Sequence, residues 1–261
     1  MTNGRLSRAE RRLLQKEDAR YLNVPFPSGP DPRPVGAHLR HMVHLLVDRT
    51  RSSPCSDMVA HVTALHDRTA PDHPGIACKK GCAHCCSQDV AITAPEAFFV
   101  AAAVRSKQTL AEALLATDDR LRGVGAVERL GQVLCPLLKD AACSIYAARP
   151  LACRGFVSVS LPACLATFVD HQAPNVPMPQ ANVNVLYTMR MLLKATLRLT
   201  GLEDQTYEMT AAVAVALREP DAEKRWLNGE KIFAHIPGDP PIPPQFDVAI
   251  NQMAAYVAPT L

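Results

Sequence analysis

The chain has few aromatic residues, no long apolar run and no strong excess of charge of either sign. Phe, Trp and Tyr make up 5% of its 261 residues, which leaves little material for the aromatic-rich strands of a large sheet. The 28 basic and 25 acidic side chains leave a net charge of +3, which is too balanced for a nucleic-acid-binding protein. No run approaches the roughly eighteen apolar residues that cross a bilayer, so we expect no membrane partner.

The N-terminal segment lacks the features of a secretory signal. Its first twenty residues are charged and contain no apolar stretch of the kind that a signal peptide needs. We therefore expect a cytoplasmic protein, in which thiols stay reduced. In that setting nine cysteines predict metal ligation rather than a disulfide framework.

The composition favours helices over sheets. The hydrophobic share of 48% is sufficient for a sizeable core, and alanine is a strong helix former. We predict a mainly α fold, with a single helical domain around an irregular cysteine-rich metal-binding core and at most two short strands. The expected parts are a basic N-terminal helix with a proline-rich linker (1–34), a helical lead-in (35–76), a cysteine-cluster metal-binding domain (77–164) and a C-terminal helical region that packs on it (165–261).

Local patterns predict several element boundaries. Capping boxes at Ser7–Glu10 and Thr93–Glu96 each predict the start of a helix, and the second of these helices should be buried because it is nearly all apolar. Alternating residues predict one short strand at Val90 to Ile92 and another at Phe156 to Val159, paired with each other. A further helix is expected at 204–218.

Three histidines, at 38, 41 and 44, recur at i, i+3 and i+6 of an expected helix. Imidazoles gathered on one helix face would suggest a metal site. However, no HExxH pattern occurs, and position i+6 turns well away from position i. We therefore predict no ligand role for His38, His41 and His44.

The cysteines fall into two groups. The first reads Cys78-x3-Cys82-x2-Cys85-Cys86, and the second reads Cys135-x7-Cys143-x9-Cys153-x10-Cys164. Thiolates bind soft or borderline metals, chiefly zinc and the irons of iron–sulfur clusters. Short spacings let several sulfurs converge on one centre with little loss of loop entropy. We predict these eight cysteines as metal ligands and treat Cys55 as an extra thiol.

Basic residues stand beside the cysteines. Four thiolates around Zn²⁺ or a [4Fe–4S]²⁺ core leave a net charge of about −2. The side chains of Lys79, Lys80, Arg149 and Arg154 are placed to offset that charge and to donate hydrogen bonds to the ligands. We predict that Arg149, Arg154 and Tyr146 contact the ligands rather than the metal.

The spacing leaves the identity of the metal open. Zinc sites usually use two CxxC pairs, and only Cys82-x2-Cys85 has that form. The CxxxCxxC spacing of Cys78, Cys82 and Cys85 is also that of the radical SAM signature, but that enzyme class needs a (β/α) barrel and the flanking chain here is helical. His84 could replace one sulfur. Successive side chains diverge, so Cys86 could reach a second metal, and one centre or two nearby centres are both compatible with the pattern.

The composite pattern resembles that of a known family. Residues 135–138 read Cys-Pro-Leu-Leu, and Cys143-x-Ile-Tyr-x2-Arg-Pro-x2-Cys153-Arg-x-Phe follows. With the first cysteine group, the Thr-Ala-Pro-Glu segment and Cys164, this resembles the CxxCxxCC family of zinc- or iron-chelating domains, also called YkgJ-type cysteine cluster proteins. The resemblance covers about Ala77 to Cys164 and departs from the family in its three-residue gap after Cys78.

The resemblance implies an eight-cysteine metal site. One branch, the flagellin lysine N-methylases, is similar through this domain, and it implies an iron–sulfur cluster with SAM-dependent methyl transfer to a protein substrate. We therefore expect a protein that holds a [4Fe–4S] cluster or zinc, with an N-methylase as the alternative and metal storage or delivery as the second alternative. Catalysis would require an open coordination position at the metal. The sequence identifies no catalytic residue and no SAM pocket.

Overall fold

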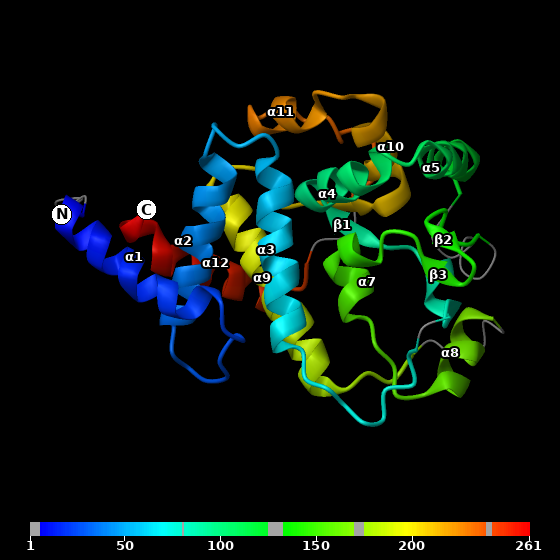
Figure 1. Cartoon of the computed structure of the whole chain (residues 1–261), viewed down its shortest axis with the longest axis horizontal. Coiled ribbons are helices and arrows are strands. Elements are labelled where there is room, and N and C mark those ends of the chain that lie inside the picture. The colour runs from blue at the N-terminus through cyan, green and yellow to red at the C-terminus, as the bar shows by residue number, and fades with distance from the viewer. Residues whose placement is uncertain (1–5, 80, 125–132, 170–174, 239–241) are drawn as a thin grey trace. The chain divides into compact units, whose positions relative to one another are not determined.

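The structure is a computed structural model that describes residues 6–79, 81–124, 133–169, 175–238 and 242–261. Over these ranges the chain is mainly helical (Figure 1), which confirms the predicted fold class. The chain divides into two compact units rather than one. The first comprises Met1–Ala70, Val185–Asp204 and Pro240–Leu261, and the second comprises Pro71–Asn184 and Gln205–Asp239. None of the described helices is long and apolar enough to cross a membrane.

The first unit is a set of helices packed around α2. Its elements are α1 (Arg8–Leu22), α2 (Arg33–Val47), α3 (Pro54–Thr69), the larger part of α9 (Gln180–Leu199), α12 (Pro244–Val257) and the 3₁₀ turn η3 (Ala258–Thr260). Helices α1, α3 and α12 all contact α2. The apolar face of α2 carries Leu39, Met42 and Leu46, each at most 1% exposed, so the flanks of the chain bury a core of their own.

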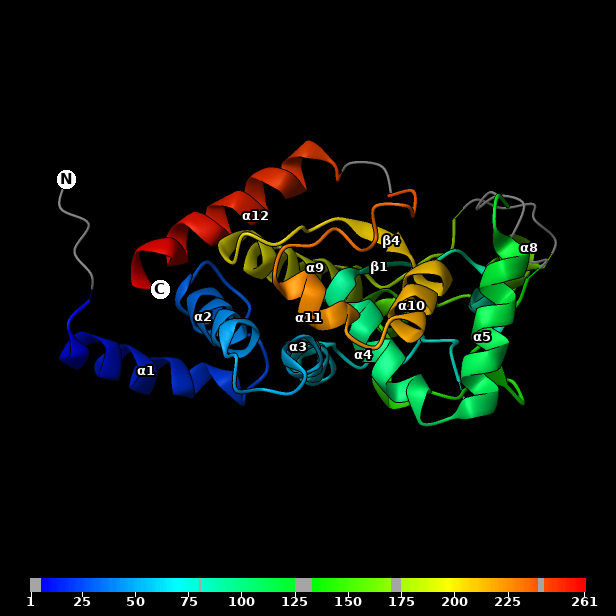
Figure 2. The ribbon, with the colours of Figure 1, turned by 90° about the horizontal axis from the view of Figure 1, so that it is seen from above.

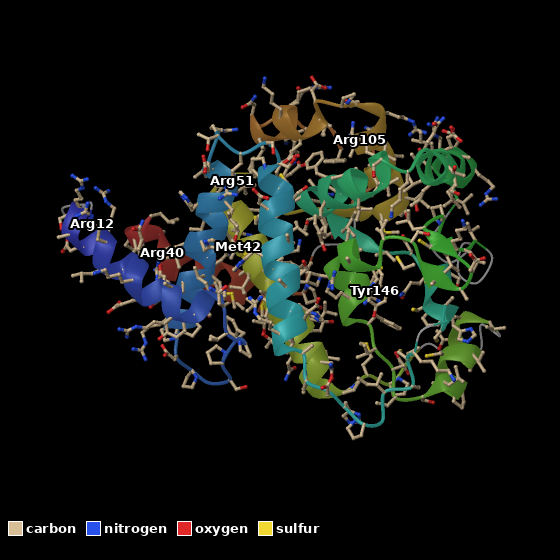
Figure 3. All side chains as sticks on the ribbon, in the orientation of Figure 1. Arg12, Arg40, Met42, Arg51, Arg105 and Tyr146 are labelled. Atoms are coloured by element: carbon tan, nitrogen blue, oxygen red, sulfur yellow. The ribbon has the colours of Figure 1, made fainter. Side chains whose placement is uncertain are left out.

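A buried ion pair joins two helices of this unit. Arg40 on α2, which Figure 3 labels beside α1, donates through Nε and Nη2 to the carboxylate oxygens of Asp18 at 2.7 and 2.5 Å. Its Nη1 donates to the hydroxyl of Thr260 at 3.1 Å. A bidentate pair of this kind fixes orientation as well as distance. Helix α1 itself begins at the predicted capping box, where the N–H of Glu10 donates to Ser7 Oγ at 3.2 Å.

The second unit is built on a two-stranded antiparallel sheet. Strand β1 (Ala91–Thr93) pairs with β4 (Thr206–Glu208), with Ile92 opposite Tyr207. Each strand leads directly into a helix, α4 (Ala94–Arg105) or α10 (Met209–Arg218), and these two helices pack on each other and on α5 (Gln108–Leu121), as Figure 2 shows. Phe98, Trp226 of α11 (Ala222–Leu227) and Phe233 form an aromatic cluster in its core.

The strand predictions are correct for the first strand and wrong for its partner. Residues 156–159 form no strand, because their backbone bonds elsewhere: the carbonyl of Ser158 accepts from the N–H of Ala77 at 2.8 Å, and Val159 donates to Pro177 at 3.1 Å. The partner, β4, takes the first residues of the helix expected at 204–218. A hairpin of β2 (Leu138–Lys139) and β3 (Ala142–Cys143) adds two more short strands, so the described chain has four strands where at most two were expected.

Four short helical elements complete the second unit. They are η1 (His84–Ser87), η2 (Tyr146–Ala148), α7 (Leu151–Gly155) and α8 (Leu161–Phe168). Together with the β2–β3 hairpin they carry five of the eight predicted cysteine ligands, namely Cys85, Cys86, Cys143, Cys153 and Cys164. The remaining residues of this segment are turns and irregular chain, as expected for a cysteine-rich core.

Candidate metal centre

The first cysteine group is arranged by a tight turn and a 3₁₀ turn. The N–H of Cys82 donates to the carbonyl of Lys79 at 2.9 Å, and Gly81 between them has φ +89°. Only glycine adopts that conformation without strain, which accounts for its position between two cysteines. Element η1 then carries Cys85 and Cys86. Lys80 lies outside the described residues.

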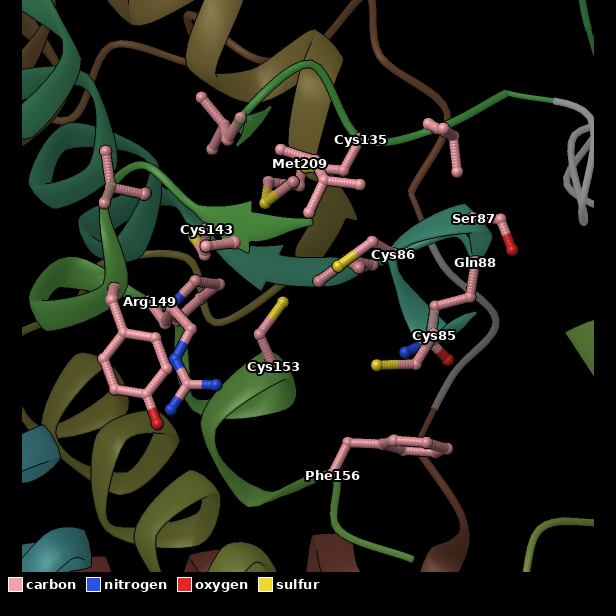
Figure 4. Close-up of a pocket in the computed structure, with 18 of the residues that line it drawn as sticks. Cys85, Cys86, Ser87, Gln88, Cys135, Cys143, Arg149, Cys153, Phe156 and Met209 are labelled. Carbon is pink, nitrogen blue, oxygen red and sulfur yellow. The ribbon is translucent and has the colours of Figure 1, made fainter. Parts of the chain in front are cut away.

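Cys85 and Cys86 face the same space. Figure 4 shows their side chains on one side of a cavity and that of Cys153 on the other, all directed toward the region between them. A hydrogen bond with the Cys86 thiol and then burial raise the pKa of the Cys85 thiol. Side chains of successive residues usually point apart, but the 3₁₀ turn brings the Cys85 and Cys86 thiols within hydrogen-bond distance of each other.

The backbone joins the second cysteine group to the first. The N–H of Cys135 donates to the carbonyl of Cys86 at 2.7 Å. Cys143 lies on β3 opposite Leu138, and the hairpin turns through Asp140 and Ala141 at φ +50° and +57°. A turn with two successive positive φ values suits the twist of a two-residue hairpin. The hairpin thus returns the chain so that Cys143 stands near Cys135.

Glu96 fixes the position of the helix that carries Cys153. Its Oε2 accepts from the N–H and hydroxyl of Thr93, both at 2.9 Å, and so completes the predicted capping box. Its Oε1 accepts from the N–H of Leu151, the first residue of α7, at 2.9 Å. One carboxylate that is only 4% exposed therefore holds the first turns of both α4 and α7. The sequence predicted the first role but not the second.

Cys78 and Cys164 lie on a second side of the site. The N–H of Ser158 donates to Cys78 Sγ at 3.3 Å. Cys164 is 6% exposed on α8, which packs against η1. Ser160 caps the start of α8, and its Oγ accepts from the N–H of Ala163. Burial raises the pKa of the Cys78 thiol, the Ser158 N–H opposes this, and the nearby thiols of Cys82, Cys85 and Cys164 raise it further.

One cavity brings the two groups together. It has a volume of about 680 Å³ and is lined by Cys78, Cys82, Cys85, Cys86, Cys135, Cys143 and Cys153. Seven of the eight predicted cysteines therefore share one cavity, and Cys164 lies outside its lining. Cys55 is fully buried in α3 of the first unit. Among the described residues, no three His, Cys, Asp or Glu side chains are gathered closely enough to hold a metal ion as they stand.

The surroundings of Cys135 and Cys153 favour the protonated form of both thiols without metal. Burial raises the pKa of Cys135 to about 11, and the neighbouring Cys143 thiol adds to this. Burial also raises the pKa of Cys153, where the Cys135, Cys85 and Cys143 thiols act in the same direction and the Arg149 cation acts against them. A metal that binds here must displace protons, since the thiolate is the ligand form.

Tyr146, Arg149 and Arg154, the residues predicted to contact the ligands, lie in one short segment of the chain and are linked to one another. The guanidinium of Arg149 lies 3.7 Å from the ring centre of Tyr146, a cation–π contact. Arg154 is 9% exposed and donates to the backbone carbonyls of Ala147 at 2.6 Å and Arg149 at 3.4 Å. Figure 3 places Tyr146 beside α7. Arg154 thus fixes the loop, and Arg149 and Arg154 both line the cavity.

Several residues of the cavity, among them a carboxylate and a thioether, were not identified from the sequence. Glu208 and Met209 line it from the start of α10, where the pairing of β4 with β1 places them. The Glu208 carboxylate accepts from two N–H groups in the first turn of α10 at 2.9 and 2.7 Å. No local pattern marks these residues, because their position depends on a strand pairing between distant segments.

The comparisons with known proteins agree with this geometry. Residues 77–175 match the model of the CxxCxxCC family, described as "Putative zinc- or iron-chelating domain". The match covers all eight cysteines that line or adjoin the cavity. Searches of curated proteins and of solved structures returned no match.

Proposed function

We propose that the eight cysteines within residues 77–175, the segment that matches the CxxCxxCC domain, hold zinc or an iron–sulfur cluster. The observation that carries the proposal is the single cavity lined by seven cysteines from both sequence groups. Thiols suit zinc and iron–sulfur irons and suit hard cations poorly. The donor set therefore fits the metals that the family description names.

Six of the eight thiols fall into two neighbourhoods. Cys78 lies near Cys82 and Cys164, whereas Cys153 lies near Cys135 and Cys143. The nearby Cys85 thiol adds to the rise in pKa of both Cys78 and Cys153, for which burial is the main cause. Each group contains three thiols, and the Cys85–Cys86 pair supplies two more. If one member of the pair binds with each group, the site contains two centres of four sulfurs. Four sulfurs satisfy one tetrahedral zinc or one cluster.

Metal analysis of paired variants tests the two-centre arrangement. Cys82→Ala and Cys153→Ala remove one thiol from each neighbourhood. Two separate centres predict that each variant loses about half of the metal, whereas a single shared centre predicts that each loses all of it. Elemental analysis and the visible spectrum after anaerobic purification distinguish zinc, which is colourless, from an iron–sulfur cluster.

The cavity volume supports an enzyme as the second candidate. The cavity, at about 680 Å³, falls within the roughly 300–1,000 Å³ of small-molecule sites. Space beside a metal is what a SAM-dependent N-methylase acting on a protein lysine would require. Methyl transfer to a lysine peptide by the anaerobically purified protein is the test, and a centre with every position filled by sulfur would argue against it. Storage or delivery, the third candidate, predicts rapid exchange of the metal with a chelator.

When bound, the metal would supply a soft Lewis acid or an electron carrier to this cavity. The residues of the chain have separate tasks. Burial raises the pKa of the Cys153 thiol, and the Cys86 thiol together with burial raises that of Cys85; the Arg149 cation opposes both increases and so favours the ligand form of the two thiols. Arg154 holds the loop between Cys143 and Cys153, because its guanidinium donates to the carbonyl oxygens of Ala147 and Arg149 in that loop.

A further inference from the structure

Arg149 carries a charge that no carboxylate balances among the described residues. The ion pairs described in the second unit belong to Arg122, Arg218 and Arg225. The Nε of Arg149 is buried and has no hydrogen-bond acceptor. Because a guanidinium stays charged at physiological pH, a buried donor of this kind is unfavourable unless a ligand accepts from it.

The orientation of this guanidinium is fixed before any ligand arrives. Its central carbon lies over the ring of Tyr146, at 3.7 Å from the ring centre. Arg154 binds the carbonyl oxygens of Ala147 and Arg149, and Pro150 follows with φ −63° as the N-cap of α7. Figure 4 shows Arg149 at the edge of the cavity, beside Cys143 and Cys153. A rigid cation at the edge of a cavity loses little entropy when it binds an anion.

The cationic side chains that line the cavity outnumber its carboxylates. Its lining contains three cations, Lys79, Arg149 and Arg154, and one carboxylate, Glu208. The Glu208 carboxylate is engaged by N–H groups in the first turn of α10, and Arg154 is engaged by backbone carbonyls. Arg149 is therefore the cation best placed to bind an incoming anion.

We propose that Arg149 binds the carboxylate of a small molecule whose apolar part lies against the cavity walls. The planar guanidinium matches a carboxylate through two parallel N–H···O bonds. Much of the wall is apolar and includes Ile76, Val90, Leu121, Leu134, Phe156 and Met209. A phosphate dianion would require more charged donors than one guanidinium and would gain nothing from these walls. The inference goes beyond the proposed metal centre, because it gives the Arg149 cation a ligand other than the thiolates whose formation it favours.

Hexanoate is a suitable probe, with hexanol and inorganic phosphate as comparison ligands. Calorimetric titration of the full chain, with its metal as purified, should show hexanoate binding about tenfold or more tighter than either of them, because only hexanoate combines carboxylate and apolar chain. Arg149→Gln should weaken hexanoate binding by about tenfold or more, and Arg149→Lys should weaken it less, since lysine keeps the charge without the planar fork. Arg120→Gln, an exposed arginine of the same unit that does not line the cavity, should change nothing.

Metal content measured on the same samples separates this inference from the proposed function. Equal hexanoate binding by wild type and Arg149→Gln, no binding by wild type, or tighter binding of phosphate would overturn the carboxylate site. Loss of the metal from both Arg149 variants would also overturn it, because the guanidinium would then serve the thiolates alone. Wild-type protein that binds hexanoate through Arg149 but contains no metal would instead overturn the metal centre and leave this inference intact.

Discussion

The backbone N–H of Cys135 donates a 2.7 Å hydrogen bond to the carbonyl oxygen of Cys86. A backbone hydrogen bond of this kind fixes the separation of the two segments, so the two cysteine side chains extend from neighbouring backbone positions. It joins the first cysteine group to the second across a long stretch of sequence. The cavity lined by seven cysteines follows from this contact, from the β2–β3 hairpin and from the position of α7.

Removing the Glu96 carboxylate should destabilise the second unit. Glu96→Ala leaves the buried N–H groups of Thr93 and Leu151 without their acceptor, which costs about 1–3 kcal/mol for each such group. We expect a lower midpoint of urea unfolding and weaker metal binding, because α7 carries Cys153. The exposed Glu112 on α5, which accepts from Gln108, provides the control: Glu112→Ala should behave as wild type. Unchanged unfolding of Glu96→Ala would contradict the role of Glu96 as a link between α4 and α7.

Metal affinity should increase with pH. Burial raises the pKa of Cys135 to about 11, and the pKa values of Cys78, Cys85 and Cys153 are raised as well. At neutral pH the metal-free thiols are protonated, so each thiolate that forms on binding releases a proton. Competition with a chromophoric chelator at pH 6.5, 7.5 and 8.5, values chosen to bracket neutrality, should show affinity increasing at each step. An affinity that is independent of pH would mean that these thiols are not the ligands.

The Arg40–Asp18 pair should stabilise the first unit. The two side chains are 14% and 13% exposed. Arg40→Met removes the cation and leaves a buried carboxylate, which costs about 3 kcal/mol when a buried pair is broken. Urea unfolding followed by circular dichroism measures the loss. The matched control is Arg33→Met, since the Arg33–Asp31 pair in the same unit is largely exposed and exposed pairs contribute little. Equal stability of the two variants would contradict this assignment.

Acid should weaken the first unit through buried histidines. His38 Nδ1 and His61 Nε2 are 3.0 Å apart, and the ring of His41 contacts that of His61. Burial, followed by the charge of His41, lowers the pKa of His38 to about 4 and that of His61 to about 3. The sequence pattern drew attention to His38, His41 and His44 on one helix. In the structure, the first two of them contact His61 on a second helix.

The sign of this pH effect follows from the lowered pKa values. Neutral rings favour folding above pH 6.5, and below it the unfolded chain binds protons that the folded chain does not, so stability decreases between pH 6.5 and about 3. His61→Gln should remove part of that decrease, on the order of 2 kcal/mol, in thermal unfolding recorded from pH 7 to pH 4. His235→Gln, which changes an exposed histidine, should leave it unchanged. Identical pH profiles for wild type and His61→Gln would contradict this assignment.

Local signals in the sequence predicted much of the structure. The capping boxes at Ser7 and Thr93 mark true helix starts. Short-range hydrogen bonds and backbone preferences determine these features, so they can be predicted from a few adjacent residues.

The errors concern long-range pairing. The partner of β1 is β4 rather than residues 156–159, because both segments can extend and only the tertiary structure selects one. The same selection places Glu208 and Met209 in the cavity and gives Glu96 its second partner, Leu151. The cysteine motif predicted eight thiols at one site, and seven of them line one cavity, but the contacts that bring them together depend on residues that no motif marks.

Metal content per chain, measured on wild type, Cys153→Ala and Cys55→Ala, tests the central claim most directly. Cys153 lines the cavity, whereas Cys55 is buried in the first unit, so both changes remove a thiol and only one removes a predicted ligand. We predict zinc or iron in wild type and in Cys55→Ala, and a loss of metal together with a lower melting temperature in Cys153→Ala, since bound metal adds to folding stability. Wild-type protein free of both zinc and iron, or a Cys153→Ala variant with its full metal content, would contradict the account.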